Sequence, residues 1–511
     1  MIAALLLAAA APAVTVEGGR LEGVALTSGV SAYLGVPFAA PPVRDLRWKP
    51  PQPAPGWSGT RHADRAAPEC LQPLRGSMQN HYFGEEATSE DCLYLNIWAP
   101  RRAAKAPVIV WIYGGGFNIG SASMANYSGA PLAGDGVVRV NIAYRVGPLG
   151  FLAHPDLTAE SGYGGSGNYG LMDQIAALQW VKRNIARFGG DPDNVTIVGQ
   201  SAGSMSVSIL QVSPLARGLF AKAVGMSGSG FAGMIGPAAL DAAEAQGIAF
   251  QQAAGAASLA ELRALPGDRL IATTAPRDPI VRDGRVVTDT AEAVFAAGGA
   301  ARVPVLIGYT RDESFGPLGP VADAAALKTA VTARFGATAP AVLAAYRSGS
   351  PARDAADIAR DASVGRQMAG WAIAQQRAAA PAYAYLFARR QPYAAGIRFS
   401  DHDPATAGAY HSGDVPYWLG TRDSLDLFRR TRDWQAGDTT LEAEMRAALL
   451  AFARTGRPAS PAIGAWPAFD AAAPRLVSLD TTSGIVAWPH FADLPLLATA
   501  QRPGRPGRPR D

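Results

Sequence analysis

The sequence contains only two cysteines and six histidines among its 511 residues, so ligands for a metal site are few. Two cysteines cannot by themselves supply the four ligands of a typical structural zinc site, and the histidines do not cluster at ligand spacing. We therefore expect no metal, and no motif in the sequence indicates any other cofactor.

Charged residues make up only 17 % of the chain, and just five of the 46 basic residues are lysine. Most of the net charge of +4 lies in residues 502–511, which carry four arginines and one aspartate and leave about +1 for the rest. Nucleic-acid binding requires basic residues gathered on one folded face and interleaved with aromatic side chains. No such cluster is present, so we expect no nucleic-acid partner.

No stretch reaches about 18 consecutive apolar residues, so we expect no membrane-spanning helix. The longest apolar run, at the N-terminus, ends in the A-x-A pattern Ala11-Pro12-Ala13, typical of a signal-peptide cleavage site. We interpret residues 1–13 as a signal peptide and expect export to the periplasm or the medium. The alternative is an N-terminal strand, and cleavage after Ala13 is left open.

What the chain does have is 48 % hydrophobic residues with 56 glycines and 39 prolines, a composition typical of a large, loop-rich core. This excludes a disordered chain. Apolar runs typical of strands buried on both faces occur at residues 108–112, 137–144, 195–198 and 303–309.

Residues 171–188 show helical apolar spacing, and a turn is expected at 191–193. Alternation of strands and helices predicts an α/β fold with a large, mainly parallel sheet and helices on both faces. We expect a small antiparallel sheet within residues 14–38 and Ala-rich helices within 235–300. Residues 14–500 are expected to form one domain, and residues 501–511 a disordered tail rich in Arg, Pro and Gly.

The sharpest motif is Gly199-Gln200-Ser201-Ala202-Gly203, a G-x-S-x-G sequence between a predicted strand and a predicted helix. In this context the two glycines permit a tight turn that exposes a nucleophilic serine hydroxyl. We predict that Ser201 is a nucleophile; the alternative is a Gly-Ser turn that only packs a helix on a sheet.

A second glycine motif, Tyr113-Gly114-Gly115-Gly116-Phe117, follows the strand that ends at Ile112. Consecutive glycines let main-chain N–H groups approach a bound oxyanion. We assign the N–H donors to Gly115, Gly116 and Ala202; the alternative is an ordinary glycine turn. Three histidines follow Ser201, namely His402, His411 and His490, and Arg311-Asp312-Glu313 offers two candidate acids at the end of a strand.

The motifs together resemble the type-B carboxylesterase (carboxylesterase/cholinesterase) family of the α/β-hydrolase fold, in a bacterial-type form. The resemblance covers about residues 15–490 and implies hydrolysis of esters of small molecules. The matching segments are residues 33–39, 89–98, 144–151, 167–174, 193–204, 219–220 and 227–229.

The resemblance implies that Glu313 is the acid and His411 the base of a Ser-His-Glu triad with Ser201. His411 lies in Tyr410-His411-Ser412-Gly413-Asp414-Val415-Pro416-Tyr417, which is similar to the family's histidine segment. Asp312 is then a loop-forming neighbour, and the other histidines are packing or surface residues.

The resemblance also implies a disulfide between Cys70 and Cys92, the alternative being two unrelated buried thiols. It further implies ion pairs between Arg47 and Glu90 and between Arg145 and Asp173. Two other residues, Gln200 and Ser227, are expected beside the triad.

Two departures from the family bear on substrates. Gln200 stands where many members have Glu, and no Trp lies between the cysteines, so a site for quaternary ammonium groups is not expected. We expect a broad acyl or aryl esterase that acts through an acyl-enzyme. A non-catalytic binding protein is the rival class, and amide, carbamate or carbonate hydrolysis stays open, as do the natural substrate, enantiopreference and oligomeric state.

Overall fold

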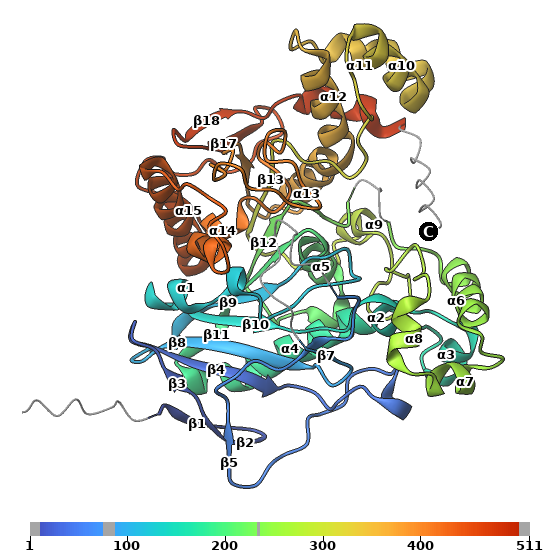
Figure 1. Ribbon diagram of the computed structural model, residues 1–511, viewed down its shortest axis with the longest axis vertical. Helices are drawn as coiled ribbons and strands as arrows, with labels where there is room; N and C mark the ends of the chain where they lie inside the picture. Colours follow the sequence, from blue (N-terminus) through green and yellow to red (C-terminus); the bar gives the residue numbers. More distant parts are fainter. Residues whose placement is uncertain (1–10, 75–86, 232–235, 500–511) are drawn as a thin grey trace, which may run out of the picture.

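The computed structural model describes residues 11–74, 87–231 and 236–499. An eleven-stranded sheet runs through the centre of the molecule (Figure 1). In spatial order its strands are β18 (Gly484–Ala487), β17 (Arg475–Leu479), β14 (Ala382–Phe387), β13 (Val305–Thr310), β12 (Lys222–Met226), β11 (Gly190–Gln200), β9 (Ala106–Ile112), β10 (Val138–Ile142), β8 (Tyr94–Pro100), β4 (Val30–Pro37) and β3 (Val24–Ala25).

The middle of this sheet is parallel and both edges are antiparallel. Strands from β10 to β17 pair in parallel, whereas β8, β4 and β3 at one edge and β18 at the other pair antiparallel. Every residue of β12 and β13 is buried, which explains why these strands are apolar without alternation. The predicted, mainly parallel sheet is confirmed.

Helices cover both faces of the sheet. On one face α4 (Tyr169–Asn184) and α5 (Ala202–Val212) pack on β11, and α13 (Arg366–Arg377) packs on β13 and β14. On the other face α1 (Ala130–Gly134) packs on β8 and β10, and α15 (Ala436–Thr455) packs on β9 and β11. Figure 1 shows α15 and α5 on opposite sides of β12.

The remaining α-helices lie at the periphery or in the loops that follow the strands. In the Ala-rich region 235–300 the predicted helices are present. They are α6 (Leu240–Ala254), α7 (Leu259–Ala264), α8 (Gly267–Ala272) and α9 (Ala291–Ala296). The other helices are α2 (Gly147–Phe151), α3 (Pro155–Glu160), α10 (Ala324–Phe335), α11 (Ala339–Ala345), α12 (Pro351–Arg360) and α14 (Val415–Leu419).

The segment after α4 differs from the predicted turn. The predicted helix ends as a 3-10 turn at Ile185–Phe188, and Gly189 has a positive φ of 83°. Gly190 already pairs with Ala106, so β11 begins before the expected turn and continues through it. The register shifts between Gly190 and Val195, so residues 191–193 form an irregularity inside a strand and the prediction of a separate turn is wrong.

A small separate sheet lies at the N-terminal end. β1 (Ala13–Val16) and β2 (Gly19–Glu22) form the predicted antiparallel pair, but β5 (Thr60–His62) joins β2 in parallel, so the sheet is mixed. A long connection separates β5 from β2. Unlike a tight hairpin, a long connection allows the two strands to pair in parallel.

Some predictions fall outside the described residues. The proposed tail at 501–511 lies beyond them, and most of the proposed signal peptide precedes them. His81 also lies outside the described ranges. Among the helices of the described ranges, none has both the length and the apolarity needed to cross a membrane.

Candidate active site

Ser201 lies at a sharp turn between the end of β11 and the start of α5. Its φ of 58° and ψ of −125° are unfavourable for a residue with a side chain, and its N–H donates to the Met226 carbonyl at 2.8 Å. A Cβ at position 199 would collide with the Gly203 main chain, and one at position 203 would collide with Ile112 O. Glycine is therefore required on both sides of the strained serine, as the motif predicts.

Glu313 and His411 are brought together from two loops that follow neighbouring strands, β13 and β14. The Glu313 carboxylate is buried and its Oε1 accepts from Thr310 N at 2.8 Å, while Oε2 bonds to His411 Nδ1. The His411 ring packs edge-on against Phe315, with centroids 5.0 Å apart. A carboxylate on Nδ1 fixes the tautomer that carries its proton there and leaves Nε2 as an acceptor.

Gln200, the residue before Ser201, reaches that second ring nitrogen. Its Nε2 lies 3.1 Å from His411 Nε2, and the side chain is buried. The amide therefore donates to the nitrogen that would accept a proton from a serine. This contact joins the turn at Ser201 to the Glu313–His411 pair.

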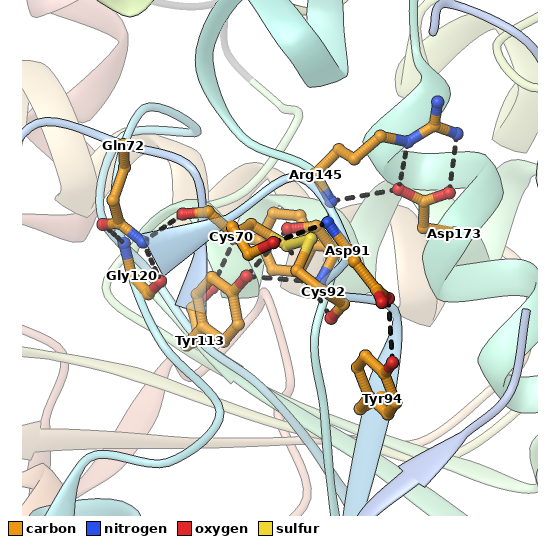
Figure 2. The surroundings of a disulfide bond; sticks show 11 residues. Cys70, Gln72, Asp91, Cys92, Tyr94, Tyr113, Gly120, Arg145 and Asp173 are labelled. Atoms are coloured by element: carbon orange, nitrogen blue, oxygen red, sulfur yellow. Dashed lines mark hydrogen bonds and ion pairs between the residues drawn. A yellow bond between two sulfur atoms is a disulfide. The ribbon is translucent and has the colours of Figure 1, made fainter. Parts of the chain in front are cut away.

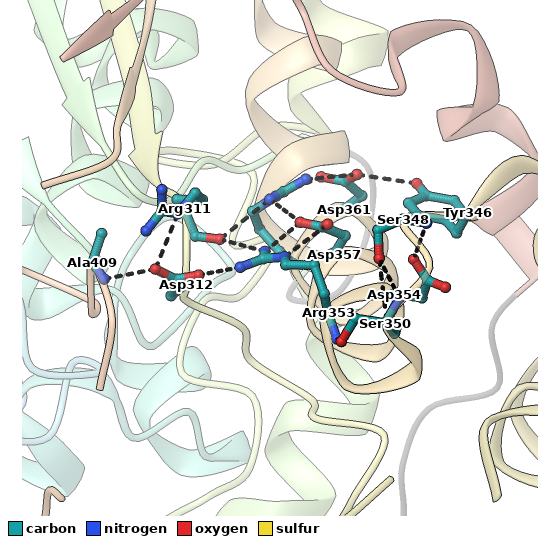
Figure 3. Close-up of polar contacts among 11 residues, drawn as sticks. Arg311, Asp312, Tyr346, Ser348, Ser350, Arg353, Asp354, Asp357, Asp361 and Ala409 are labelled. Atoms are coloured by element: carbon teal, nitrogen blue, oxygen red, sulfur yellow. Dashed lines mark hydrogen bonds and ion pairs between the residues drawn. The ribbon is translucent and has the colours of Figure 1, made fainter. Parts of the chain in front are cut away.

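Asp312, the other candidate acid, points away from His411. Its Oδ2 accepts from Ala409 N at 2.7 Å, its own N–H donates to Ala409 O at 3.0 Å, and its Oδ1 contacts Arg353 (Figure 3). Asp312 thus fastens the acid loop to the segment that precedes His411. Of the two adjacent carboxyl groups, Glu313 is the one that reaches the histidine.

A network of arginines and aspartates on α12 and at Asp361, the residue that follows it, packs against the loop that carries Asp312 and Glu313. Arg353 also binds Asp357, Arg360 binds Asp357 and Asp361, and both arginines donate to the Arg311 carbonyl at 3.3 and 3.2 Å. Figure 3 shows these groups running from Ala409 to α12. We did not anticipate this network from the sequence. The i, i+4 and i, i+3 spacing of its charges is the signal that could have shown it.

The Gly-rich loop after β9 lies against the Ser201 turn. A Cβ at position 114 would lie 2.9 Å from Ser201 Cβ, and Gly115 and Gly116 have positive φ values of 119° and 62°. Within the described residues, the N–H groups of Gly115, Gly116 and Ala202 donate to no protein acceptor. Main-chain N–H groups without a protein acceptor, close to a serine at a strained turn, are the kind of donors that can bind an oxyanion.

The disulfide Cys70–Cys92 is present, with Cα atoms 4.9 Å apart and both residues buried (Figure 2). It links β6 (Glu69–Cys70) to the residues just after β7 (Thr88–Ser89). Both predicted ion pairs are confirmed: Arg47 bonds to both carboxylate oxygens of Glu90 at 2.5 Å, and Arg145 bonds to Asp173 at 2.7 and 2.8 Å.

Ser227 follows β12 with a positive φ of 60° and is fully buried. Its N–H donates to Gly308 O at 2.8 Å, whereas its Oγ has no hydrogen-bond partner among the described residues. Among the described residues, no direct hydrogen bond joins Ser227 to Ser201 or His411. Its role beside the triad therefore stays a prediction.

Asp414 is a buried acid near His411 that the sequence did not identify. Burial raises its pKa to about 6, and its Oδ2 accepts from Tyr385 OH at 2.7 Å. The nearby Glu313 charge also raises this pKa, whereas the Tyr385 hydrogen bond and His411 lower it. The signal that could have identified it is its place in the family-like histidine segment, where Pro416 and Tyr417 follow shortly after it.

The remaining described histidines lie elsewhere. His402 bonds to Tyr393, His490 stacks on Tyr346, His154 accepts from Asp156 N, and His62 lies near Glu22. Each therefore has a local packing or hydrogen-bonding role, in line with the prediction. No group of three potential metal ligands occurs within the described ranges.

Comparison with known proteins supports the fold and its general activity. The model of the carboxylesterase family matches residues 10–488. The chain is 38 % identical to fumonisin B1 esterase of Sphingopyxis macrogoltabida, over 89 % of this chain and 84 % of that protein. It is 32 % identical to para-nitrobenzyl esterase of Bacillus subtilis, over 92 % and 94 %.

Solved structures give the same result. A PNB esterase superposes with a TM-score of 0.78 at 30 % identity, covering 95 % of this chain and 99 % of the other. A thermophilic PNB esterase superposes with a TM-score of 0.79. The chain therefore belongs to the carboxylesterase family, and it is a carboxylesterase of the α/β-hydrolase fold.

Proposed function

We propose that this carboxylesterase cleaves its ester through a triad of Ser201, His411 and Glu313 and an acyl-enzyme intermediate. The observation that carries the proposal is the buried Glu313 carboxylate on His411 Nδ1, because the other nitrogen of the same ring reaches the residue next to Ser201. The strained turn at Ser201 supports the proposal, since such strain is typical of functional sites.

In the proposed reaction, His411 Nε2 takes the Ser201 proton as Oγ attacks the ester carbonyl carbon. Glu313 keeps the proton on Nδ1 and stabilises the imidazolium that forms. His411 then gives its Nε2 proton to the leaving alkoxide, so that an alcohol departs and Ser201 stays acylated. Water repeats the sequence on the acyl-enzyme and releases the carboxylic acid.

The negative charge on the carbonyl oxygen is proposed to rest on the N–H groups of Gly115, Gly116 and Ala202. These groups have no other acceptor in the described residues, so they do not have to break a protein hydrogen bond to bind the oxyanion. Ala202 also begins α5, whose N-terminal end carries partial positive charge. Each such donor contributes about 10²–10³ to kcat in comparable enzymes.

Gln200 is proposed to bind His411 in the free enzyme, before substrate arrives. Its amide donates to His411 Nε2, the atom that must accept the Ser201 proton, so the two donors compete for one lone pair. When Nε2 becomes protonated, rotation of the Gln200 amide presents its oxygen instead. Gln200 is thus able to bond to both forms of the histidine, which a carboxylate could do for the charged form only.

The substrate class is proposed to be broad, covering acyl and aryl esters of small molecules. Relatives are named for differing substrates, among them fumonisin B1 esterase, para-nitrobenzyl esterase and a phenmedipham hydrolase of Pseudarthrobacter oxydans. A screen of p-nitrophenyl esters of rising acyl length, with choline ester and carbamate analogues, tests this proposal. Choline ester turnover above that of the aryl esters would contradict it.

The triad is tested by Ser201→Ala. We expect kcat for short aryl esters to fall by roughly 10⁴ or more, because the variant cannot form the acyl-enzyme. Labelling of the wild type by a fluorophosphonate probe and loss of labelling in the variant would locate the nucleophile. If purified Ser201→Ala kept a tenth of the wild-type kcat, the triad assignment would be wrong.

Export is a separate proposal that rests on the A-x-A pattern at residues 11–13. Mass spectrometry of the protein recovered from the periplasm or the medium should find a chain that lacks the apolar N-terminal run, and it would also locate the cleavage site. An uncleaved chain retained inside the cell would contradict the proposal.

A further inference from the structure

Gln72 is buried two residues after Cys70, and its whole side-chain amide is bonded to main-chain atoms. Its Nε2 donates to Gly120 O at 2.7 Å and to Cys70 O at 2.9 Å, and its Oε1 accepts from Gly120 N at 2.7 Å (Figure 2). The residue is only 2 % exposed. A side-chain amide that bonds to both the N–H and the C=O of one residue makes the pair of hydrogen bonds that a neighbouring β-strand would make. It therefore fixes the position of that residue.

Gly120 is the end of the Gly-rich loop that begins at Gly114. The loop folds back on itself, since Ile119 N donates to Gly115 O at 3.2 Å and a Cβ at position 120 would lie 2.5 Å from Gly114 O. The two ends of the loop therefore touch. A group that fixes the position of Gly120 therefore also restricts the movement of Gly114, which it contacts, and of the N–H groups that follow Gly114.

The segment that carries Gln72 is itself firmly anchored. Cys70 is bonded to Cys92, and Leu71 N donates to Ser89 O at 2.9 Å. The carbonyl of Cys70 is in turn one of the acceptors of the Gln72 amide. A continuous chain of bonds thus runs from the disulfide through Gln72 to the loop beside Ser201.

We propose that Gln72 is a positioning residue for the oxyanion-binding N–H groups, and that the disulfide acts on catalysis through it. The inference rests on the proposed function of Gly115 and Gly116. Gln72 lies outside the reacting atoms, and it acts through Gly120. Without its amide the buried N–H and C=O of Gly120 lose their partners, so the loop must rearrange to satisfy them.

The first test compares Gln72→Ala and Gln72→Glu with Gln52→Ala. Gln52 is an exposed control whose amide, among the described residues, donates to the nearby Pro50 O alone, at 2.9 Å. Glutamate keeps the shape of Gln72 but places a carboxylate oxygen against two carbonyl groups. We expect kcat to fall about 10–100-fold in both Gln72 variants, less than for loss of a whole oxyanion donor, with KM within threefold and the control unchanged.

A role in stability alone is distinguished by a transition-state analogue. A trifluoromethyl ketone adds to the serine and forms an oxyanion, so its affinity depends on the N–H donors. We expect its inhibition constant to rise in proportion to the loss of kcat/KM in the Gln72 variants. If the melting temperature falls while kcat and this inhibition constant stay within twofold of wild type, Gln72 is structural only and the inference is wrong. Should Gln72→Ala fail to fold, Gln72→Asn, which keeps the amide but shortens the side chain, takes its place.

The link to the disulfide is tested by a mutant cycle. We expect Cys70→Ala/Cys92→Ala to lower kcat, and adding Gln72→Ala to cause little further loss, because both changes act on one chain of contacts. Fully additive losses would overturn the coupling. Fluorophosphonate labelling separates the two proposals. If the wild type is not labelled, or Ser201→Ala is labelled equally, the triad is rejected. If labelling depends on Ser201 but the Gln72 variants keep wild-type kcat, only the present inference is rejected.

Discussion

The two halves of the candidate site are held in place by different kinds of interaction. The Ser201 side, residues 113–120 and 199–203, depends on main-chain geometry: glycines that admit no Cβ, a strained serine and a buried glutamine amide. The Glu313–His411 side, residues 310–313, 353–361 and 409–411, depends on charge, with Asp312 and Arg353 joining three segments. One half is fixed by shape and the other by ion pairs.

This difference has consequences for how each half responds to change. Main-chain hydrogen bonds carry no net charge, so salt screens them little. The Arg353 side chain is 31 % exposed, so its ion pair with Asp312 is accessible to salt. The contacts that hold the Ser201 side should therefore respond little to ionic strength, whereas the ion pairs behind the Glu313–His411 side should weaken as ionic strength rises.

The largest effect is expected for Glu313→Gln, which removes the only charge bonded to His411 Nδ1 within the described residues. A glutamine can bind the wrong tautomer of the histidine and cannot stabilise its charged form, so kcat should fall on the order of 10⁴. Steady-state kinetics, with folding checked by circular dichroism, measures the loss. A variant with near wild-type kcat would remove Glu313 from the triad.

Asp312→Asn should have a smaller effect, a roughly threefold to tenfold loss of kcat that shrinks as ionic strength rises, because salt also weakens the wild-type ion pair with Arg353. The amide can still accept from Ala409 N, but it loses the charge that holds Arg353. Asp193→Asn, which removes an exposed ion pair with Lys182, is the matched control. Collapse of kcat in Asp312→Asn beside an active Glu313→Gln would make Asp312 the acid.

Gln200→Glu should move the midpoint of the kcat/KM profile to higher pH, by about 0.5–1 unit. A carboxylate next to His411 Nε2 favours the charged imidazolium, and only the neutral ring accepts the serine proton. The comparison is made over pH 5–9 at constant ionic strength. An unchanged midpoint would show that position 200 is not electrostatically coupled to the histidine.

The smallest effect concerns Asp414, whose pKa in the folded protein is about 6 instead of 3.8. The folded state binds this proton more tightly than the unfolded state, so Asp414 makes the protein less stable as pH rises from 3.8 to about 6. Asp414→Asn should therefore gain melting temperature relative to wild type over this range and keep a constant difference above it. A difference that does not vary with pH would contradict the burial of this charge.

The sequence predicted the parts of the site that depend on local pattern. An unbroken apolar run predicted the strand that ends at Ile112, and glycines at fixed offsets predicted the turn at Ser201. The choice of Glu313 and His411 came from the family resemblance, because spacing alone left two acids and three histidines.

Long-range partners could not be predicted in the same way. Gln72 meets Gly120 from 48 positions away, and Arg353 meets Asp312 from 41 positions away. Neither pair belongs to a periodic pattern, so only the folded chain shows them. Arg139 is similar: it is fully buried inside β10 with its guanidinium 5.3 Å from the Trp111 ring centroid, where apolar patterning predicts no charge.

The order of strands in the sheet bears on how the enzyme is made. From β11 to one edge, the neighbours β12, β13, β14, β17 and β18 follow the order of the chain. Ser201 comes after β11, Glu313 after β13 and His411 after β14, with 211 positions between Gln200 and His411. In the proposed triad, the serine is therefore synthesised long before the histidine. A chain that does not yet extend past His411 carries the proposed nucleophile without its proposed base, so only a nearly complete chain can be active.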